Sequence, residues 1–168
     1  MARAALNQVP TSRIEWVDGI PGVASPADRF LEAMTPDRTL YDQLVLATRA
    51  LRHDPGCIDA LRLLAANHPD DNARLRLLQD AVKAGDALWG PVAANHGDRV
   101  QWWVWTATRP WMRAIAELGE AHFQADNTQA SMWCFERLLR LNPDDHQNIR
   151  GRLEHLNDDV EILELGFR

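Results

Sequence analysis

Cysteine is scarce in this sequence, and its two thiols, Cys57 and Cys134, lack the C-x-x-C spacing of redox and zinc sites. Such usage indicates buried structural cysteines in a reducing compartment, although the spacing leaves a bridge between the two open. Long apolar runs are missing too. No stretch approaches the roughly 18 residues of a membrane span, and residues 1–10 lack the apolar centre of a signal peptide. We therefore expect a soluble, cytoplasmic protein without a membrane partner.

Positive charge is also in deficit, because 18 Lys and Arg residues stand against 24 Asp and Glu residues, a net charge of -6. Nucleic-acid binding needs a surplus of cations on one face, so this balance disfavours it. The G-x-S-x-G, P-loop and G-x-G-x-x-G signatures do not occur. No two histidines stand three or four residues apart, as metal-binding pairs on a helix do. The sequence predicts a non-enzymatic protein with no cofactor and no metal.

Tryptophan is unusually frequent, with seven residues against one tyrosine and four phenylalanines. Trp102, Trp103 and Trp105 fall within four positions, so no single face of a helix or strand can bury all three rings. We expect two of them to be buried and one to lie at the surface. Exposed tryptophan is common in interfaces. The cluster therefore either packs over the end of the helical stack or anchors a partner, with a homodimer through these rings as one form of the second alternative.

The hydrophobic period is helical wherever it is clear, and no period-two strand pattern appears. This predicts an all-α fold. Gly85 is expected to end one of the helices, and the acid pairs Asp70-Asp71, Asp144-Asp145 and Asp158-Asp159 are expected to cap helix N-termini. The expected helices are 27–34, 39–53, 58–67, 73–84, 108–122, 128–141 and 146–165.

The chain divides into an N-terminal arm and one helical domain. Residues 1–26 contain several prolines and no sustained period, which indicates a flexible or extended arm, and residues 27–168 form the domain. Within the domain, 86–107 is an irregular Trp-rich insertion of uncertain secondary structure. The stack needs a cap at its C-terminal end, which either the segment 146–165 or a partner supplies.

The region 112–145 has the spacing of a tetratricopeptide repeat (TPR). Ile115, Leu118-Gly119 and His122 follow the W-x2-L-G-x2-Y pattern of the first TPR helix, and Ser131 and Phe135 follow the A-x3-F of the second. A weaker copy lies upstream, after Pro55. Pro55 and Pro143 are 88 residues apart, about 20 more than two repeats of ~34 residues. The surplus is close to the length of the insertion.

Two longer segments carry a family resemblance. TRPWMRA at 108–114 and LRLNPDDHQNIR at 139–150 resemble TRPYMRA and LRLNPNDNQGVR, found in bacterial TPR proteins related to the suppression of tumorigenicity seven family. Trp111 stands where that family has Tyr, and His146 and Asn148 replace Asn and Gly. The resemblance covers roughly 55–155. It implies TPR-like antiparallel helix pairs stacked in a short right-handed superhelix and a scaffold role, and it implies no biochemical activity.

These features predict a scaffold or adaptor that binds a protein or peptide through its helical groove and Trp-rich insertion, within a larger complex. The candidate partner-binding residues are Trp102, Trp103, Trp105, Arg109, Arg113, Glu117, Glu120, Gln124, Gln147, Arg150 and Glu154. For the polar members, a solvated face is the plainer alternative. A second hypothesis is an RNA- or ribosome-associated factor. It would use the arginines of the C-terminal half, namely Arg109, Arg113, Arg137, Arg140, Arg150 and Arg152.

Overall fold

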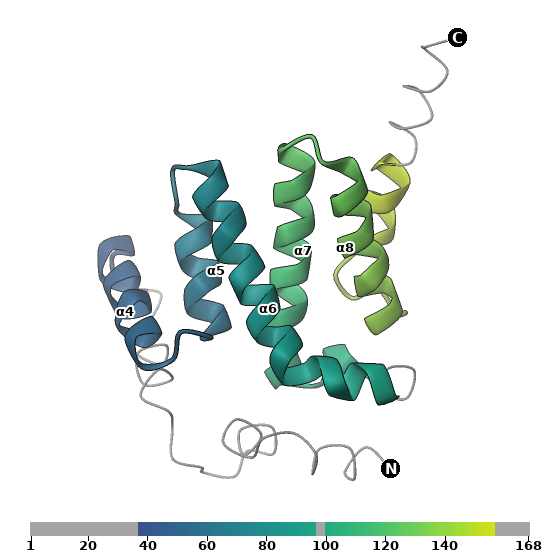
Figure 1. Ribbon diagram of the computed structural model, residues 1–168, viewed down its shortest axis with the longest axis horizontal. Coiled ribbons are helices and arrows are strands. Elements are labelled where there is room, and N and C mark those ends of the chain that lie inside the picture. Colours follow the sequence, from purple (N-terminus) through teal and green to yellow (C-terminus); the bar gives the residue numbers. More distant parts are fainter. Residues whose placement is uncertain (1–36, 97–99, 157–168) are drawn as a thin grey trace.

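The computed structural model describes residues 37–96 and 100–156, which contain helices and no strand (Figure 1). The α-helices are α4 (Leu40–His53), α5 (Ile58–Ala66), α6 (Asp71–His96), α7 (Arg109–Gln124) and α8 (Thr128–Leu141). Two 3-10 turns, η2 (Trp102–Val104) and η3 (Thr106–Thr108), join α6 to α7. A last helical segment, 150–156, closes the described chain. The all-α prediction is confirmed, while the arm 1–26, the helix 27–34 and Asp158-Asp159 lie outside the described residues.

Local side-chain caps explain where several helices begin. Thr39 Oγ1 accepts from the backbone N–H of Asp42 at the start of α4, with an N···O distance of 3.2 Å. Asp70 Oδ1 accepts from the N–H of Ala73 at 2.6 Å, at the start of α6. The Asp145 carboxylate accepts from the N–H groups of residues 149 and 150, at the start of the last helical segment. The predicted capping role is confirmed for Asp70 and Asp145, one member of each of the first two acid pairs, while Asp71 lies in the first turn of α6.

The predicted end of a helix at Gly85 is wrong, because α6 continues through Gly85 to His96. Gly85 serves packing instead: a Cβ atom at this position would overlap the ring of Trp111 on α7. The missing side chain therefore lets α7 approach α6 closely. Beyond Gly90, Pro91 stands inside the helix, and α6 changes direction near its C-terminal end (Figure 1). The first part of the predicted insertion 86–107 is thus a continuation of α6, and the rest holds η2 and η3.

Successive helices pack side by side in a row, from α4 at one end to α8 near the other, and α5 also contacts α7 directly (Figure 1). The main hydrophobic core runs through α5, α6, α7, α8 and the last helical segment. A small second cluster, made of Ala47, Ala50, Cys57 and Ala60, joins α4 to α5. Both cysteines are buried and neither is part of a disulfide, as expected for structural thiols. Within the described ranges, no helix has the length and apolar character needed to cross a membrane.

Candidate partner-binding site

The site is built on a buried stack of three tryptophans. The Trp102 ring is fully buried and meets Trp89 of α6 and Trp111 of α7 edge to face, with ring centroids 6.5 and 5.7 Å apart. The hydroxyl of Thr108 donates to the carbonyl oxygens of Trp102 and Trp105, which ties η2 to η3. Residues 102–108 are therefore held firmly against α6 and α7, although they contain no long helix.

Trp103 and Trp105 are each only half-buried, so the expectation of two buried rings and one surface ring is wrong. One ring, Trp102, enters the core completely, and the other two lie at its edge. The reason is the 3-10 geometry of η2, in which successive side chains point about 120° apart around the axis. When Trp102 points inward, its neighbour Trp103 must point sideways.

Three cationic or titratable side chains surround the Trp103 ring. The guanidinium carbons of Arg109 and Arg113, one turn apart on α7, lie 5.5 and 5.9 Å from the ring centroid. Arg109 Nε also donates to the carbonyl oxygen of Trp103 at 2.9 Å. His146, from the loop after α8, stacks on the ring with centroids 6.2 Å apart and an interplanar angle of 16°. We call Trp103, Arg109, Arg113 and His146 the Trp103 site.

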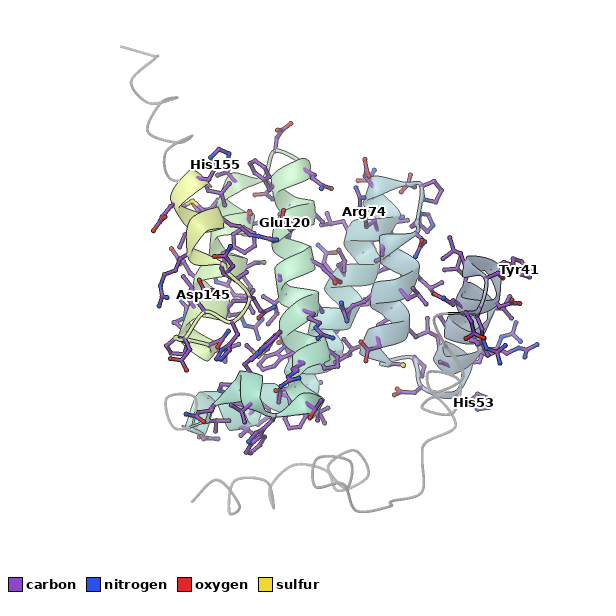
Figure 2. All side chains as sticks on the ribbon, turned by 180° about the vertical axis from the view of Figure 1, so that it is seen from behind. Tyr41, His53, Arg74, Glu120, Asp145 and His155 are labelled. Carbon is purple, nitrogen blue, oxygen red and sulfur yellow. The ribbon has the colours of Figure 1, made fainter. Side chains whose placement is uncertain are left out.

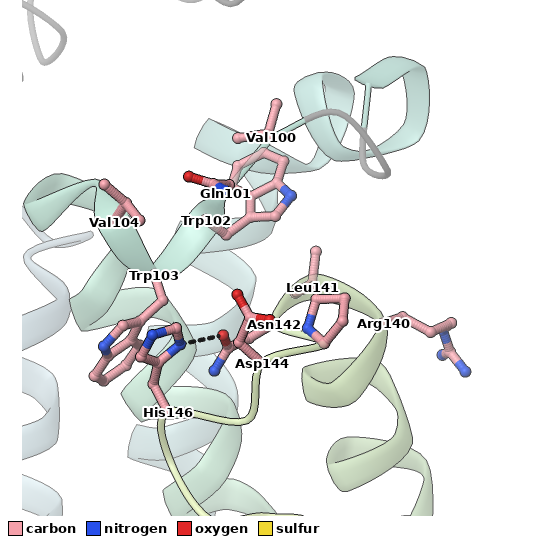
Figure 3. Close-up of a pocket in the computed structure, with 11 residues that line it drawn as sticks. Val100, Gln101, Trp102, Trp103, Val104, Arg140, Leu141, Asn142, Asp144 and His146 are labelled. Atoms are coloured by element: carbon pink, nitrogen blue, oxygen red, sulfur yellow. Dashed lines mark hydrogen bonds between the residues drawn. The ribbon is translucent and has the colours of Figure 1, made fainter.

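A pocket of about 320 Å³ opens beside this site, between η2 and the loop that follows α8 (Figure 3). Its two walls are formed by residues 100–104 and by residues 140–144 with His146. Asn142 is almost fully buried in the second wall, and its Oδ1 lies 2.8 Å from Nδ1 of His146. This hydrogen bond fixes the imidazole in the plane that stacks on Trp103.

The arginines of the Trp103 site differ from other arginines that link helices. Arg62 of α5 pairs with Glu117 of α7 at 2.5 Å, Arg137 of α8 pairs with Asp86 of α6, and Arg152 pairs with Glu120 of α7. Arg109 and Arg113 have no ion pair with any carboxylate among the described residues. A local excess of positive charge therefore lies on a chain whose net charge is -6.

Of the predicted site residues, the structure brings together Trp103, Arg109 and Arg113. Trp102 lies beneath them, while Trp105 packs at the edge of the core. The others lie elsewhere or bond within the chain: Glu117 to Arg62, Glu120 to Arg152, Gln147 Nε2 to the Met112 carbonyl, and Arg150 to the Pro143 carbonyl. Gln124 and Glu154 are exposed. Figure 2 shows Glu120 on α7 from behind, within the row of helices.

Two members of this region carried no signal that sequence reasoning could use. His146 lies in the segment 139–150 that resembles the TPR family but departs from its pattern, and its position on the Trp103 ring depends on how the loop after α8 folds back. The buried Asn142 reads in the sequence only as the residue before a helix-ending proline. No group of three or more His, Cys, Asp or Glu residues within the described ranges has the arrangement to hold a metal ion.

Comparison with models of protein families, with curated proteins and with solved structures finds no match to this chain. The TPR resemblance therefore rests on the residues quoted for it above.

Proposed function

We propose that this chain is a TPR-like scaffold that binds a protein partner through the Trp103 site. The observation that carries the proposal is a half-exposed indole, flanked by two arginines and a histidine, at the mouth of a pocket of about 320 Å³. Tryptophan and arginine dominate the binding energy of protein interfaces, most of all next to a pocket that a partner side chain fills.

The rigidity of the site supports the same proposal. Trp102, next in the chain, is fully buried, and Arg109 bonds the Trp103 carbonyl, so the indole is already fixed before a partner arrives. Burying a side chain that is already ordered loses little conformational entropy, which leaves more of the contact energy as affinity. A merely solvated polar face would need no such support beneath it.

The TPR-like part of the proposal has its own support. We take α5 with α6 and α7 with α8 as two helix pairs, because α5 contacts α7 as well as its own neighbour α6. Ion pairs from Arg62 to Glu117 and from Arg152 to Glu120 link α5, α7 and the last helical segment into one row. Such a row of first helices presents the extended surface that helical-repeat proteins use for binding.

The RNA-binding alternative is weaker on charge. Of its six arginines, Arg137 forms an ion pair with Asp86 and Arg152 forms one with Glu120. Nη1 of Arg140 lies 3.9 Å from Oε2 of Glu136. Each of these carboxylates would repel a phosphate backbone. We therefore favour a protein partner.

The proposal is tested by affinity capture from an extract of the source cells with the full chain as bait. Trp103→Ala is compared with Trp133→Ala, which removes an exposed indole from α8 and serves as the matched control. We expect a stoichiometric partner with the wild type and the control, and at least about tenfold less of it with Trp103→Ala.

A second variant guards against misfolding. Arg113 is exposed and its described contact is with the Trp103 ring, so Arg113→Glu changes the site without opening the core. It should lower capture while circular dichroism and thermal unfolding match the wild type. Absence of any stoichiometric partner, or equal capture by all variants, would show that the proposed function is wrong.

A further inference from the structure

We infer that the group recognised at the Trp103 site is a side-chain carboxylate, presented by an acidic, extended segment of the partner protein. This inference rests on the proposed function and deepens it, because it names the chemistry of the partner. It commits to an Asp or Glu residue between Arg109 and Arg113, with a neighbouring apolar side chain in the adjoining pocket.

The first argument is the pairing of like charges. Arg109 and Arg113 are four residues apart on α7 and lean on the same indole, with their guanidinium carbons 5.5 and 5.9 Å from its centroid. Like charges at this spacing repel each other on a helix. Contact with the ring face offsets part of that repulsion, but no carboxylate among the described residues neutralises either group. A bound carboxylate would relieve the repulsion.

Other arginines of the same protein show what such a carboxylate does. Arg62, Arg137 and Arg152 each extend from one helix to a carboxylate on another, and Arg62 contacts both oxygens of Glu117, at 2.9 and 2.5 Å. Two-pronged pairing of this kind is the strongest common mode of recognition between arginine and carboxylate. At the Trp103 site, two arginines are present, and no carboxylate among the described residues pairs with them.

The donors that remain also suit a carboxylate. Arg109 uses its Nε on the Trp103 carbonyl oxygen, 2.9 Å away, which orients the side chain and leaves its two terminal NH2 groups for a ligand. The exposed Arg113 offers its whole guanidinium. A carboxylate beside the ring could accept hydrogen bonds from both guanidinium groups.

The pocket defines the neighbour of the acidic residue. Apolar side chains line it on both sides, with Val100 and Val104 on one wall and Leu141 on the other, and Val104 is 58% exposed. Its volume of about 320 Å³ is at the lower end of the range of ligand pockets. It therefore has room for one large side chain, whose apolar part would contact these three residues. The expected epitope is an acidic residue next to an apolar one in an extended strand of peptide.

Charge favours a short acidic peptide over a nucleic acid. The pocket itself carries no surplus of positive charge, because Asp144 lines it as well as Arg140, and the chain as a whole has a net charge of -6. A phosphate backbone brings one charge per nucleotide along its entire length and meets this repulsion repeatedly, whereas a peptide can place a single carboxylate at the two arginines.

The test is selection from a phage-displayed library of random twelve-residue peptides against the immobilised full chain. Display leaves the peptide without a free C-terminal carboxylate, so any acidic preference comes from Asp and Glu side chains. The site variant is Arg109→Gln with Arg113→Gln. The matched control is Arg49→Gln with Arg52→Gln, which removes two exposed arginines from α4 and changes the net charge equally.

Peptides selected by the wild type and by the control should be enriched in Asp and Glu over the input library, and the site variant should lose this enrichment. A labelled selected peptide should bind the site variant at least about tenfold more weakly. The same peptide should lose as much affinity for the wild-type chain when its Asp and Glu residues are changed to Asn and Gln.

Selected peptides without acid enrichment, or an enrichment that the site variant retains, would overturn the inference, as would a selection that yields no peptide dependent on both arginines. If such peptides still lose binding with Trp103→Ala, the proposed function stands and only the carboxylate is wrong. The carboxylate inference would also be overturned, in favour of nucleic acid, by the behaviour of a labelled twelve-uridine RNA. That RNA would have to displace the peptides, depend on the same arginines and bind with a steep salt dependence.

Discussion

At the scale of single residues, Gly119 determines how closely α7 approaches α8. A Cβ atom there would lie 2.6 Å from Cε1 of Phe135, whose ring is 2% exposed and has little room to move. Alanine gains about 1 kcal/mol in helix propensity, but overpacking of a core costs about 1–3 kcal/mol. We expect Gly119→Ala to lower the free energy of unfolding in urea by up to about 2 kcal/mol.

Gly151 is the control for this substitution, because a Cβ atom there meets nothing within 4 Å. Gly151→Ala should leave the free energy of unfolding unchanged or raise it by up to about 1 kcal/mol. Equal stabilisation by both substitutions would contradict the close packing of α7 on α8.

Cys134 links burial to the pH dependence of stability. Burial raises the pKa of its thiol from 9.0 to about 11, and the nearby Arg137 opposes the rise. As the pH rises, the thiol ionises at a lower pH in the unfolded chain than in the folded chain. The contribution of Cys134 to the free energy of unfolding is therefore complete below pH 9 and is lost as the pH rises to about 11. Urea unfolding at pH 8, 9.5 and 11 should show a steeper alkaline loss for the wild type than for Cys134→Ala. Between pH 8 and pH 11, the wild type should lose on the order of 2 kcal/mol more free energy of unfolding than Cys134→Ala. Equal losses in the two proteins would contradict the raised pKa of the thiol.

At the scale of helices, Asp86 joins α6 to both α7 and α8. Its carboxylate accepts from Trp111 Nε1 at 2.9 Å and from two nitrogens of Arg137, one of them at 3.2 Å. Asp86→Ala would leave a buried indole N–H and a largely buried guanidinium without an acceptor. We expect the free energy of unfolding to fall by roughly 3 kcal/mol.

Two further substitutions separate the parts of this contact. Asp86→Asn keeps an acceptor oxygen for the indole and should cost about half as much. Asp80→Ala removes an exposed carboxylate from the same helix and should change stability by less than about 0.5 kcal/mol. If urea unfolding shows that Asp86→Ala loses no more free energy of unfolding than Asp80→Ala, the contact that Asp86 makes with α7 and α8 would be contradicted.

At the scale of the whole molecule, the row of helices is not equally stable along its length. The buried residues of the cluster that joins α4 to α5 are all small, and the leucines packed against them are only partly buried. By contrast, α7 lies in the main core with Trp111, Met112 and Ile115 fully buried. Tyr41, on the outer side of α4, is 75% exposed (Figure 2). Small side chains bury little apolar area, so α4 should open before the rest of the chain does.

Hydrogen exchange read by mass spectrometry measures this difference. Amides at 44–53 of α4 should exchange at least about tenfold faster than amides at 112–121 of α7, under conditions where the chain stays folded. Equal protection in both segments would show that the described helices open as one unit. It would also contradict the repeat-like, neighbour-by-neighbour stability expected of a helical stack.

Particular residues show how far prediction from the sequence reached. The bounds of α4 and α8 and the capping carboxylates Asp70 and Asp145 follow from signals that lie within a few positions of each other, and these predictions are confirmed. The helix end predicted at Gly85 is wrong because a glycine at a helix end and a glycine under a neighbouring ring look alike in the sequence. The TPR-like stacking, the scaffold role and the partner stay predictions.

The sequence by itself determined the all-α class and the positions of most helices, because hydrophobic period and capping act over one or two turns. Only the tertiary structure decided that α6 passes through Gly85 and that Trp102, rather than two of the three clustered rings, enters the core. It also decided that His146 meets Trp103 beside Arg109. These outcomes depend on contacts between segments far apart in the chain, where the space left by one element fixes what another can place there.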